Sequence, residues 1–276
     1  MASRVLLNFN GYDRRLAAAL KTQETIDYTK KLNVFKGIVY SILSSSENFP
    51  QQIKIYNGLC NAGICNPQGL AESDLSPWIK DNSKNSKKIT LKDFANWWND
   101  DAYYMILDDI NSGRKNDKQI REFLVENTPG LSYKCASLTM NMLGYENFGV
   151  LDIWGIRALV SDPKYRPYIK SYKFNPHNST RSETSLENNI LVLEPPPAKK
   201  FTGKRREKHT HLGYGMYLDR GIADKEYLIY EPFFIEKAHT MGYGTLEFKH
   251  LLHVKNSTYR KSNMIDQLML DYSFQD

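Results

Sequence analysis

The sequence contains few cysteines and lacks long apolar runs. Its thiols, Cys60, Cys65 and Cys135, are odd in number and too few for a disulfide framework or a four-thiolate iron–sulfur cluster. No stretch approaches the roughly 18 apolar residues of a membrane-spanning helix, and Met1–Phe9 lacks the zones of a secretory signal peptide. We therefore expect a soluble, cytoplasmic protein with no membrane partner, no metal site and no iron–sulfur cofactor.

Basic residues are in modest excess over acidic ones. The 276 residues include 37 lysines and arginines against 31 acidic residues, a formal net charge of +6. Such a balance suits a polyanionic partner but does not identify one. With 41% apolar residues, a chain of this length buries roughly 70–75% of its unfolded surface. It can therefore fold without covalent or metal cross-links.

Apolar residues recur at helical spacing through most of the chain. One predicted helix face consists of residues at i, i+3, i+4, i+7 and i+8, namely Phe35, Ile38, Val39, Ile42 and Leu43. Further helices are predicted over residues 50–59, 118–126 and 133–143, and Gly144 suits the end of the last one. The pattern predicts a mainly helical protein.

Three other helix starts are predicted. Thr90 is expected to open a helix after the solvated loop Asp81–Lys88. The helical pattern resumes over Pro232–Thr240, and Thr245 is expected to be the N-cap of the helix that follows.

The sequence changes character between residues 166 and 221. Alternating or β-rich stretches there are separated by polar and proline-rich segments, which predicts a small antiparallel β insertion. We expect helical structure over residues 1–165 and 222–256, with 257–276 as a C-terminal tail. The insertion contains Lys204, Arg205 and Arg206, whose charges suit phosphate contacts, although a solvated hairpin tip explains them equally well.

The segment from Pro129 to Leu159 carries the most chemical information. It predicts a helix, a tight Pro129–Gly130 turn, a second helix, and an aspartate, Asp152, that opens a third. Backbone N–H groups at the start of the second helix form an anion site suited to one phosphate. Lys134 lies in that first turn, where a neutral amine is favoured over an ammonium, so it is a candidate nucleophile towards a sugar carbon. Asp152 is a candidate to orient the amine or to stabilise positive charge on the sugar.

Each of these residues also has a structural interpretation. Helix–Pro–Gly–helix turns are common, a lysine on a helix is usually solvated, and an aspartate before a helix is usually an N-cap. The residues alone leave both interpretations open.

The same segment resembles the HhH-GPD superfamily of DNA glycosylases. In that family the hairpin reads Leu-Pro-Gly-Val-Gly-x-Lys-x-Ala and is followed by Val-Asp-x-His-x-x-Arg. The matching residues of this sequence are Pro129, Gly130, Lys134, Ala136, Asp152 and Arg157. A lysine at the position of Lys134 marks the bifunctional members, and the pattern of Ser44, Ser45 and Asn48 is most similar to the 8-oxoguanine glycosylases. The resemblance covers about Thr25–Leu159 and Lys225–Val254.

The resemblance implies a fold, a partner and a reaction. The fold would be a two-lobed helix–hairpin–helix (HhH-GPD) glycosylase, and the partner double-stranded DNA, bound by a monomer that is nucleoid-associated if the source is bacterial. Lys134 and Asp152 would be catalytic, cleaving the base–sugar bond and then the strand. Ser46 and Asn48 would fill the gap left by the flipped base, while Gly130 and Ser132 would hold a phosphate, with a monovalent cation as the family uses.

Three departures from the family pattern keep the substrate open. Ser132 replaces the second hairpin glycine, Trp154 replaces the histidine two residues past the aspartate, and the cysteines of cluster-bearing members are absent. The leading hypothesis is a bifunctional 8-oxoguanine glycosylase and AP lyase. A second is a defence glycosylase that excises a modified base, such as glucosylated hydroxymethylcytosine, from phage DNA. A third is a helix–hairpin–helix module that only binds DNA.

Overall fold

The computed structural model describes residues 7–45, 49–79, 86–112, 115–169, 210–211, 217–218 and 224–256, and these are mainly helical, as the sequence predicts. The helices are α1 (Gly11–Gln23), α2 (Lys31–Leu43), α3 (Phe49–Asn61), α4 (Pro67–Glu72), α5 (Ser86–Trp97), α6 (Asp100–Ser112), α7 (Asp117–Asn127), α8 (Tyr133–Met142), α9 (Ile153–Ser161), the 3-10 turn η1 (Arg166–Tyr168), α10 (Asp224–Thr240) and α11 (Thr245–Asn256).

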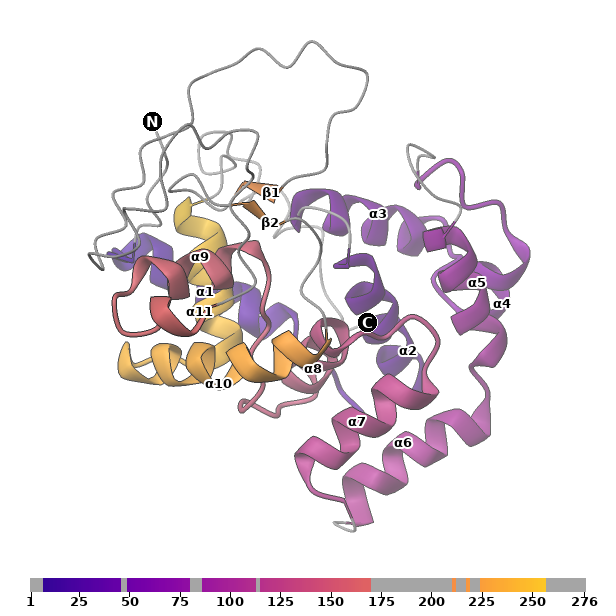
Figure 1. Ribbon diagram of the computed structural model, residues 1–276. Helices are drawn as coiled ribbons and strands as arrows, with labels where there is room; N and C mark the ends of the chain where they lie inside the picture. The colour runs from indigo at the N-terminus through magenta and orange to yellow at the C-terminus, as the bar shows by residue number, and fades with distance from the viewer. Residues whose placement is uncertain are drawn as a thin grey trace.

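The helices form two groups. Figure 1 shows α1, α9, α10 and α11 gathered on one side and α3 to α7 on the other, with α2 and α8 between them. One apolar core is built on α2, α3 and α5 to α8, and a second on α9, α10 and α11. Helices α1 and α11 pack against each other and contribute side chains to both cores. The ends of α2, α8 and α9 meet where the two groups join.

A buried ion pair links the two groups. Nη1 of Arg121 on α7 lies 2.5 Å from Oε1 of Glu231 on α10, and these residues are only 2% and 6% exposed. The same oxygen accepts a hydrogen bond from the backbone N–H of Gly149 at 3.0 Å. The Tyr227 hydroxyl donates to the carbonyl of Gly149. Two side chains of α10 therefore fix the segment that leads from α8 into α9.

Several predicted helix boundaries are confirmed. Helix α2 covers the predicted apolar face, and α7 and α8 lie within a residue of their predicted limits. Gly144, just past the end of α8, has a φ of +97°, the left-handed conformation that favours glycine at a helix end.

Two of the three predicted helix starts are wrong, because tertiary contacts extend those helices towards their N-termini. Helix α5 begins at Ser86 rather than Thr90, since buried Lys87 reaches the carbonyl of Leu43 at 3.3 Å and anchors an earlier turn. Helix α10 begins at Asp224 and carries Pro232 inside, where its buried turns offset the lost hydrogen bond. Helix α11 begins at Thr245, within a residue of the predicted start. The Thr245 hydroxyl lies 2.8 Å from both Asn141 Oδ1 and the Glu146 carbonyl, so it ties α11 to the end of α8.

The predicted β insertion falls mostly outside the described residues. Within it, β1 (Thr210–His211) pairs antiparallel with β2 (Tyr217–Leu218). The rest of residues 170–223, which includes Lys204, Arg205 and Arg206, and the tail 257–276 lie outside the described ranges.

Removing the carboxylate of the buried pair is expected to destabilise the protein strongly. Glu231→Ala leaves the Arg121 charge buried without its partner, which lowers the free energy of unfolding by about 3–5 kcal/mol. The matched control is Glu236→Ala on the same helix, which removes the exposed pair with Lys164 and costs less than about 1 kcal/mol. Urea unfolding measures both, and equal losses would contradict this role for Glu231.

Candidate functional site

The hairpin between α7 and α8 presents backbone to solvent. The N–H of Leu131 donates to the carbonyl of Thr128 at 3.2 Å, which closes the turn. Gly130 has a φ of +83°, and both it and Ser132 are exposed. Residues 125–132 line a shallow hollow beside this turn. The start of α8 can therefore approach an anion closely, as the sequence predicts.

Ser132 is the N-cap residue of α8. Its φ of −79° and ψ of 169° are extended backbone that any residue adopts, and its side chain makes no capping hydrogen bond. A serine therefore fits without strain at the position where the family pattern has a second hairpin glycine. The first-turn amides keep their capacity to bind an anion.

Lys134 reaches from the first turn of α8 to the end of α2. Its Nζ donates a hydrogen bond to the carbonyl of Ser44 at 2.6 Å. The carboxyl end of a helix carries partial negative charge, so it holds the ammonium in a defined position. The chain continues from Ser44 towards Ser46 and Asn48, the two residues predicted to enter the DNA stack. These two lie outside the described residues.

Asp152 is the N-cap of α9, as predicted, and both of its oxygens have partners. Oδ1 accepts hydrogen bonds from the N–H groups of Trp154 at 2.8 Å and Gly155 at 2.9 Å. Oδ2 pairs with Nε2 of His253 on α11. The side chains of Asp152 and His253 are only 12% and 15% exposed.

The charges around Asp152 keep its carboxyl ionised. Burial raises the pKa of the Asp152 carboxyl, but the charges of His253 and Lys134 outweigh burial and hold that pKa well below its ordinary value. The carboxylate and the Lys134 ammonium therefore interact across the junction of α8 and α9.

A second buried carboxylate lies behind this pair. Glu24, which follows α1, is fully buried and accepts hydrogen bonds from the Tyr40 hydroxyl at 2.7 Å and from Nε2 of His250 at 3.0 Å. Nζ of Lys249 lies 3.5 Å from the same Glu24 carboxylate. Burial raises the pKa of Glu24, but the charges and hydrogen bonds of these neighbours outweigh it and bring the pKa to about 2. Burial lowers the pKa of His250 to about 4.

Sequence reasoning missed the partners that α11 and α2 supply. His253 is separated from Asp152 by 101 positions, and His250 is separated from Glu24 by 226, with Lys249 next to it in the chain. The only sign of these partners in the sequence is that three basic residues, Lys249, His250 and His253, lie close together in the segment that forms α11. The Ser44 acceptor is a backbone carbonyl, which no residue pattern identifies.

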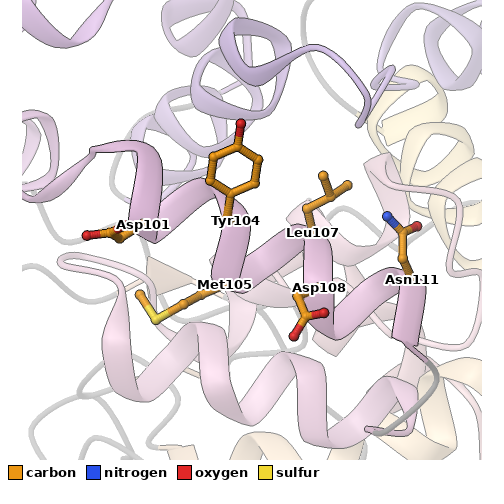
Figure 2. A pocket seen from close by; sticks show the side chains of 6 residues that line it. All are labelled: Asp101, Tyr104, Met105, Leu107, Asp108 and Asn111. Atoms are coloured by element: carbon orange, nitrogen blue, oxygen red, sulfur yellow. The ribbon is translucent and has the colours of Figure 1, made fainter.

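A hollow elsewhere on the surface is unsuited to DNA. It runs along α6, where Figure 2 shows its lining residues, Asp101, Tyr104, Met105, Leu107, Asp108 and Asn111. Its two carboxylates would repel a phosphate backbone. In the described ranges no helix is long and apolar enough to cross a membrane. The same ranges contain no group of three or more His, Cys, Asp or Glu residues that could hold a metal ion.

Comparison with known proteins identifies a family for this geometry. The family model described as 8-oxoguanine DNA glycosylase matches residues 17–173, more than half of the chain. The match includes the hairpin, Lys134 and Asp152 and ends before α10 and α11. No curated protein and no solved structure matches the chain.

A side chain at Gly130 is expected to disturb both stability and DNA affinity. A Cβ there would lie 2.1 Å from Cγ2 of Thr90, and the φ of +83° is strained for any L side chain. Gly130→Ala should therefore lower the free energy of unfolding by more than the roughly 1–2 kcal/mol of left-handed strain, and weaken binding to a duplex. Gly63→Ala is the matched control, because Gly63 has a φ of +71° but open space around its Cβ. If both variants lose equal stability and equal affinity, the close contact at the hairpin has no role.

Acid is expected to destabilise the protein through His250. Its pKa is about 4 in the fold against an ordinary 6.5, so between these values the unfolded chain binds a proton that the folded protein does not. The resulting stability is complete above pH 6.5 and falls as the pH decreases, with a slope of up to about 1.4 kcal/mol per pH unit. Glu24 adds to the loss below pH 4.5, because its pKa falls from 4.5 to about 2 on folding.

Urea unfolding between pH 7 and pH 4.5, in roughly half-unit steps, measures this slope. His250→Gln keeps an amide donor for Glu24 without a titrating ring and should flatten the slope. His239→Gln, at an exposed position near the end of α10, should leave it as in the wild type. An unchanged slope in His250→Gln would show that another group carries the pH dependence.

Proposed function

Because the chain belongs to the 8-oxoguanine DNA glycosylase family, we propose that it is a bifunctional DNA glycosylase and AP lyase with Lys134 as its nucleophile. One observation carries the proposal: the hairpin places Lys134 and Asp152 at the start of two successive helices, close enough that the lysine charge lowers the pKa of the aspartate. A module that only binds DNA needs neither residue, so their pairing favours catalysis over binding alone.

The hairpin supports the binding step. Exposed Gly130 and Ser132 would accept one phosphate of the backbone, because the first N–H groups of α8 have no partner within the helix and no side-chain cap at Ser132. Thr128 lines the same hollow, and its buried hydroxyl has no hydrogen-bond partner in the described part of the chain. The hydroxyl oxygen of Thr128 would be a ligand for a monovalent cation at the hairpin. A base within a duplex is shielded from attack, so the enzyme would flip the nucleotide, at a cost of a few kcal/mol.

The chemical step uses the Lys134 amine. After the ammonium loses its proton, Nζ attacks C1′ of the sugar, and the bond from C1′ to the base breaks with its electron pair leaving on the base. The base takes up a proton. The bond from C1′ to the ring oxygen then breaks with its electron pair leaving on that oxygen, which takes up a proton given up by Nζ, so that an iminium forms between Nζ and C1′. Loss of the C2′ proton then expels the 3′ phosphate and nicks the strand. This sequence is covalent lysine catalysis, and it requires no iron–sulfur cluster.

Asp152 would act mainly through its charge. The sequence allows two roles, deprotonation of Lys134 and stabilisation of positive charge on the sugar. A carboxylate with a pKa well below its ordinary value is a weak base. It remains anionic, however, and so stabilises the positive charge that develops at C1′.

We take 8-oxoguanine as the first candidate base because the matching family model is described as 8-oxoguanine DNA glycosylase. Trp154 and the insertion at 166–221 are the features that favour a different base, such as glucosylated hydroxymethylcytosine of phage DNA. We place the protein on double-stranded DNA as a monomer, in the cytoplasm and on the nucleoid if the source is bacterial.

Borohydride trapping tests the nucleophile and the base together. Duplexes carrying 8-oxoguanine, uracil, glucosylated hydroxymethylcytosine or an abasic site are incubated with enzyme and reductant. The wild type should form a covalent adduct with the abasic duplex and with one modified base, whereas Lys134→Gln should form none. Lys87→Gln is the control, since Lys87 also reaches the end of α2 and should leave trapping intact.

The outcomes separate the hypotheses. Trapping on the abasic duplex alone keeps the lyase and removes 8-oxoguanine as the substrate. Trapping on the phage base alone supports the defence enzyme. If no duplex is trapped although each is bound tightly, the bifunctional mechanism is wrong and the DNA-binding module is the better account.

A further inference from the structure

The carboxylate of Asp152 is held from two directions. Its Oδ1 is occupied by the N–H groups of Trp154 and Gly155, which belong to the helix that Asp152 caps. Its Oδ2 is reached by Nε2 of His253, which comes from α11. One oxygen is therefore fixed by the local chain and the other by a helix about a hundred residues further along.

His253 is itself fixed by packing. The ring of Phe49, at the start of α3, lies 5.6 Å from the imidazole, measured between ring centres. The neighbouring residues Leu252 and Val254 are each only 1% exposed. The imidazole therefore approaches Asp152 from a packed helix and not from a mobile surface side chain.

His253 pairs with Asp152, whereas its basic neighbours on α11 pair with another carboxylate. On its own helix, Lys249 and His250 both face Glu24, which follows α1, at 3.5 Å and 3.0 Å. From α8, the Lys134 ammonium interacts with Asp152. The charge of Lys249 also acts on Asp152, but His253 is the α11 side chain that hydrogen-bonds the carboxylate beside the lysine nucleophile.

Position 154 does not supply an imidazole in this chain. Trp154 touches Asp152 through its backbone N–H, and its indole lies 4.5 Å from the Arg157 guanidinium, measured to the ring centre. His253 lies outside the matched range of residues 17–173. The imidazole at Asp152 is thus a feature of this chain's C-terminal helices.

We propose that His253 is a positioning residue that holds Oδ2 of Asp152 from α11, so that the carboxylate faces Lys134 and the sugar as an anion. The inference rests on the proposed lyase function. The Nε2–H of His253 donates to the carboxylate and compensates for its burial. Without it, burial is opposed by the α9 amides, Lys134 and Lys249, and the carboxylate binds a proton at higher pH.

The charge balance around Asp152 supports this role. Burial raises the pKa of Asp152, and His253 is the largest cause acting in the opposite direction. Replacing His253 by a neutral side chain should therefore raise the pKa of Asp152. Activity would then be lost first at acid pH, where the carboxylate becomes protonated.

The test is the single-turnover nicking rate of an abasic duplex, measured from about pH 5 to pH 9. His253→Gln keeps a donor of similar length without the charge. We expect its rate to fall by roughly 10- to 100-fold, with the acid limb moved to higher pH. Affinity for a duplex carrying a tetrahydrofuran abasic analogue should stay unchanged. His239→Gln, on an exposed part of α10, is the matched control and should keep the wild-type rate and profile.

A double-mutant cycle separates positioning from a general structural effect. If His253 acts through Asp152, then His253→Gln causes no further loss in an Asp152→Asn background. An equal fractional loss in both backgrounds would overturn the proposal, as would a pH profile identical to that of His239→Gln. Should His253→Gln fail to fold, His253→Asn, with a shorter amide side chain, takes its place in both measurements.

The proposed function and this inference fail differently. If neither the wild type nor His239→Gln nicks the abasic duplex, the lyase function is wrong and His253 has no reaction to support. If both nick it and His253→Gln nicks it equally well, the lyase stands and the role of His253 is wrong.

Discussion

The geometry of the site depends on the buried ion pair between Arg121 and Glu231. Buried charges are tolerated only when they are paired and hydrogen-bonded, so this pair fixes α7 relative to α10. Because Glu231 also binds the N–H of Gly149, the pair sets where the chain enters α9. Helix α7 leads directly into the hairpin and α8. The pair therefore links the helix that leads to Lys134 with the segment that leads to Asp152.

Asp152 combines two tasks that usually belong to different residues. As an N-cap it satisfies amides at the start of α9, a stabilising role worth about 1 kcal/mol. In the proposed mechanism, the same buried anion beside Lys134 supplies the charge that a cationic sugar needs. The second task makes the carboxylate costly to bury, and His253 from α11 offsets that cost. The C-terminal helices are thus part of the site although they lie outside the matched family range.

The sequence predicted the fold class and the elements whose signals are local. The apolar face of α2, the hairpin at Gly130 and the aspartate before α9 all depend on residues within one or two helical turns. The starts of α5 and α10 were mispredicted, because long-range contacts of Lys87 and of the early turns of α10 decide them. Capping patterns do not contain that information.

The same distinction holds for the site. Lys134 and Asp152 were identified from a contiguous motif, whereas His253 and the Ser44 carbonyl were missed because only the tertiary fold brings them there. The predicted DNA contacts at 46, 48 and 204–206 lie outside the described residues and stay predictions.

In the proposed reaction, the amine that attacks C1′ belongs to Lys134. A second lysine also lies near Asp152. Buried Lys249 interacts with both Asp152 and Lys134. Digesting the reduced adduct of the wild-type enzyme with abasic DNA and sequencing the cross-linked peptide by mass spectrometry tells them apart. The account predicts the DNA remnant on Lys134, in the peptide that contains the hairpin. A remnant on Lys249, or on any other lysine, would contradict it.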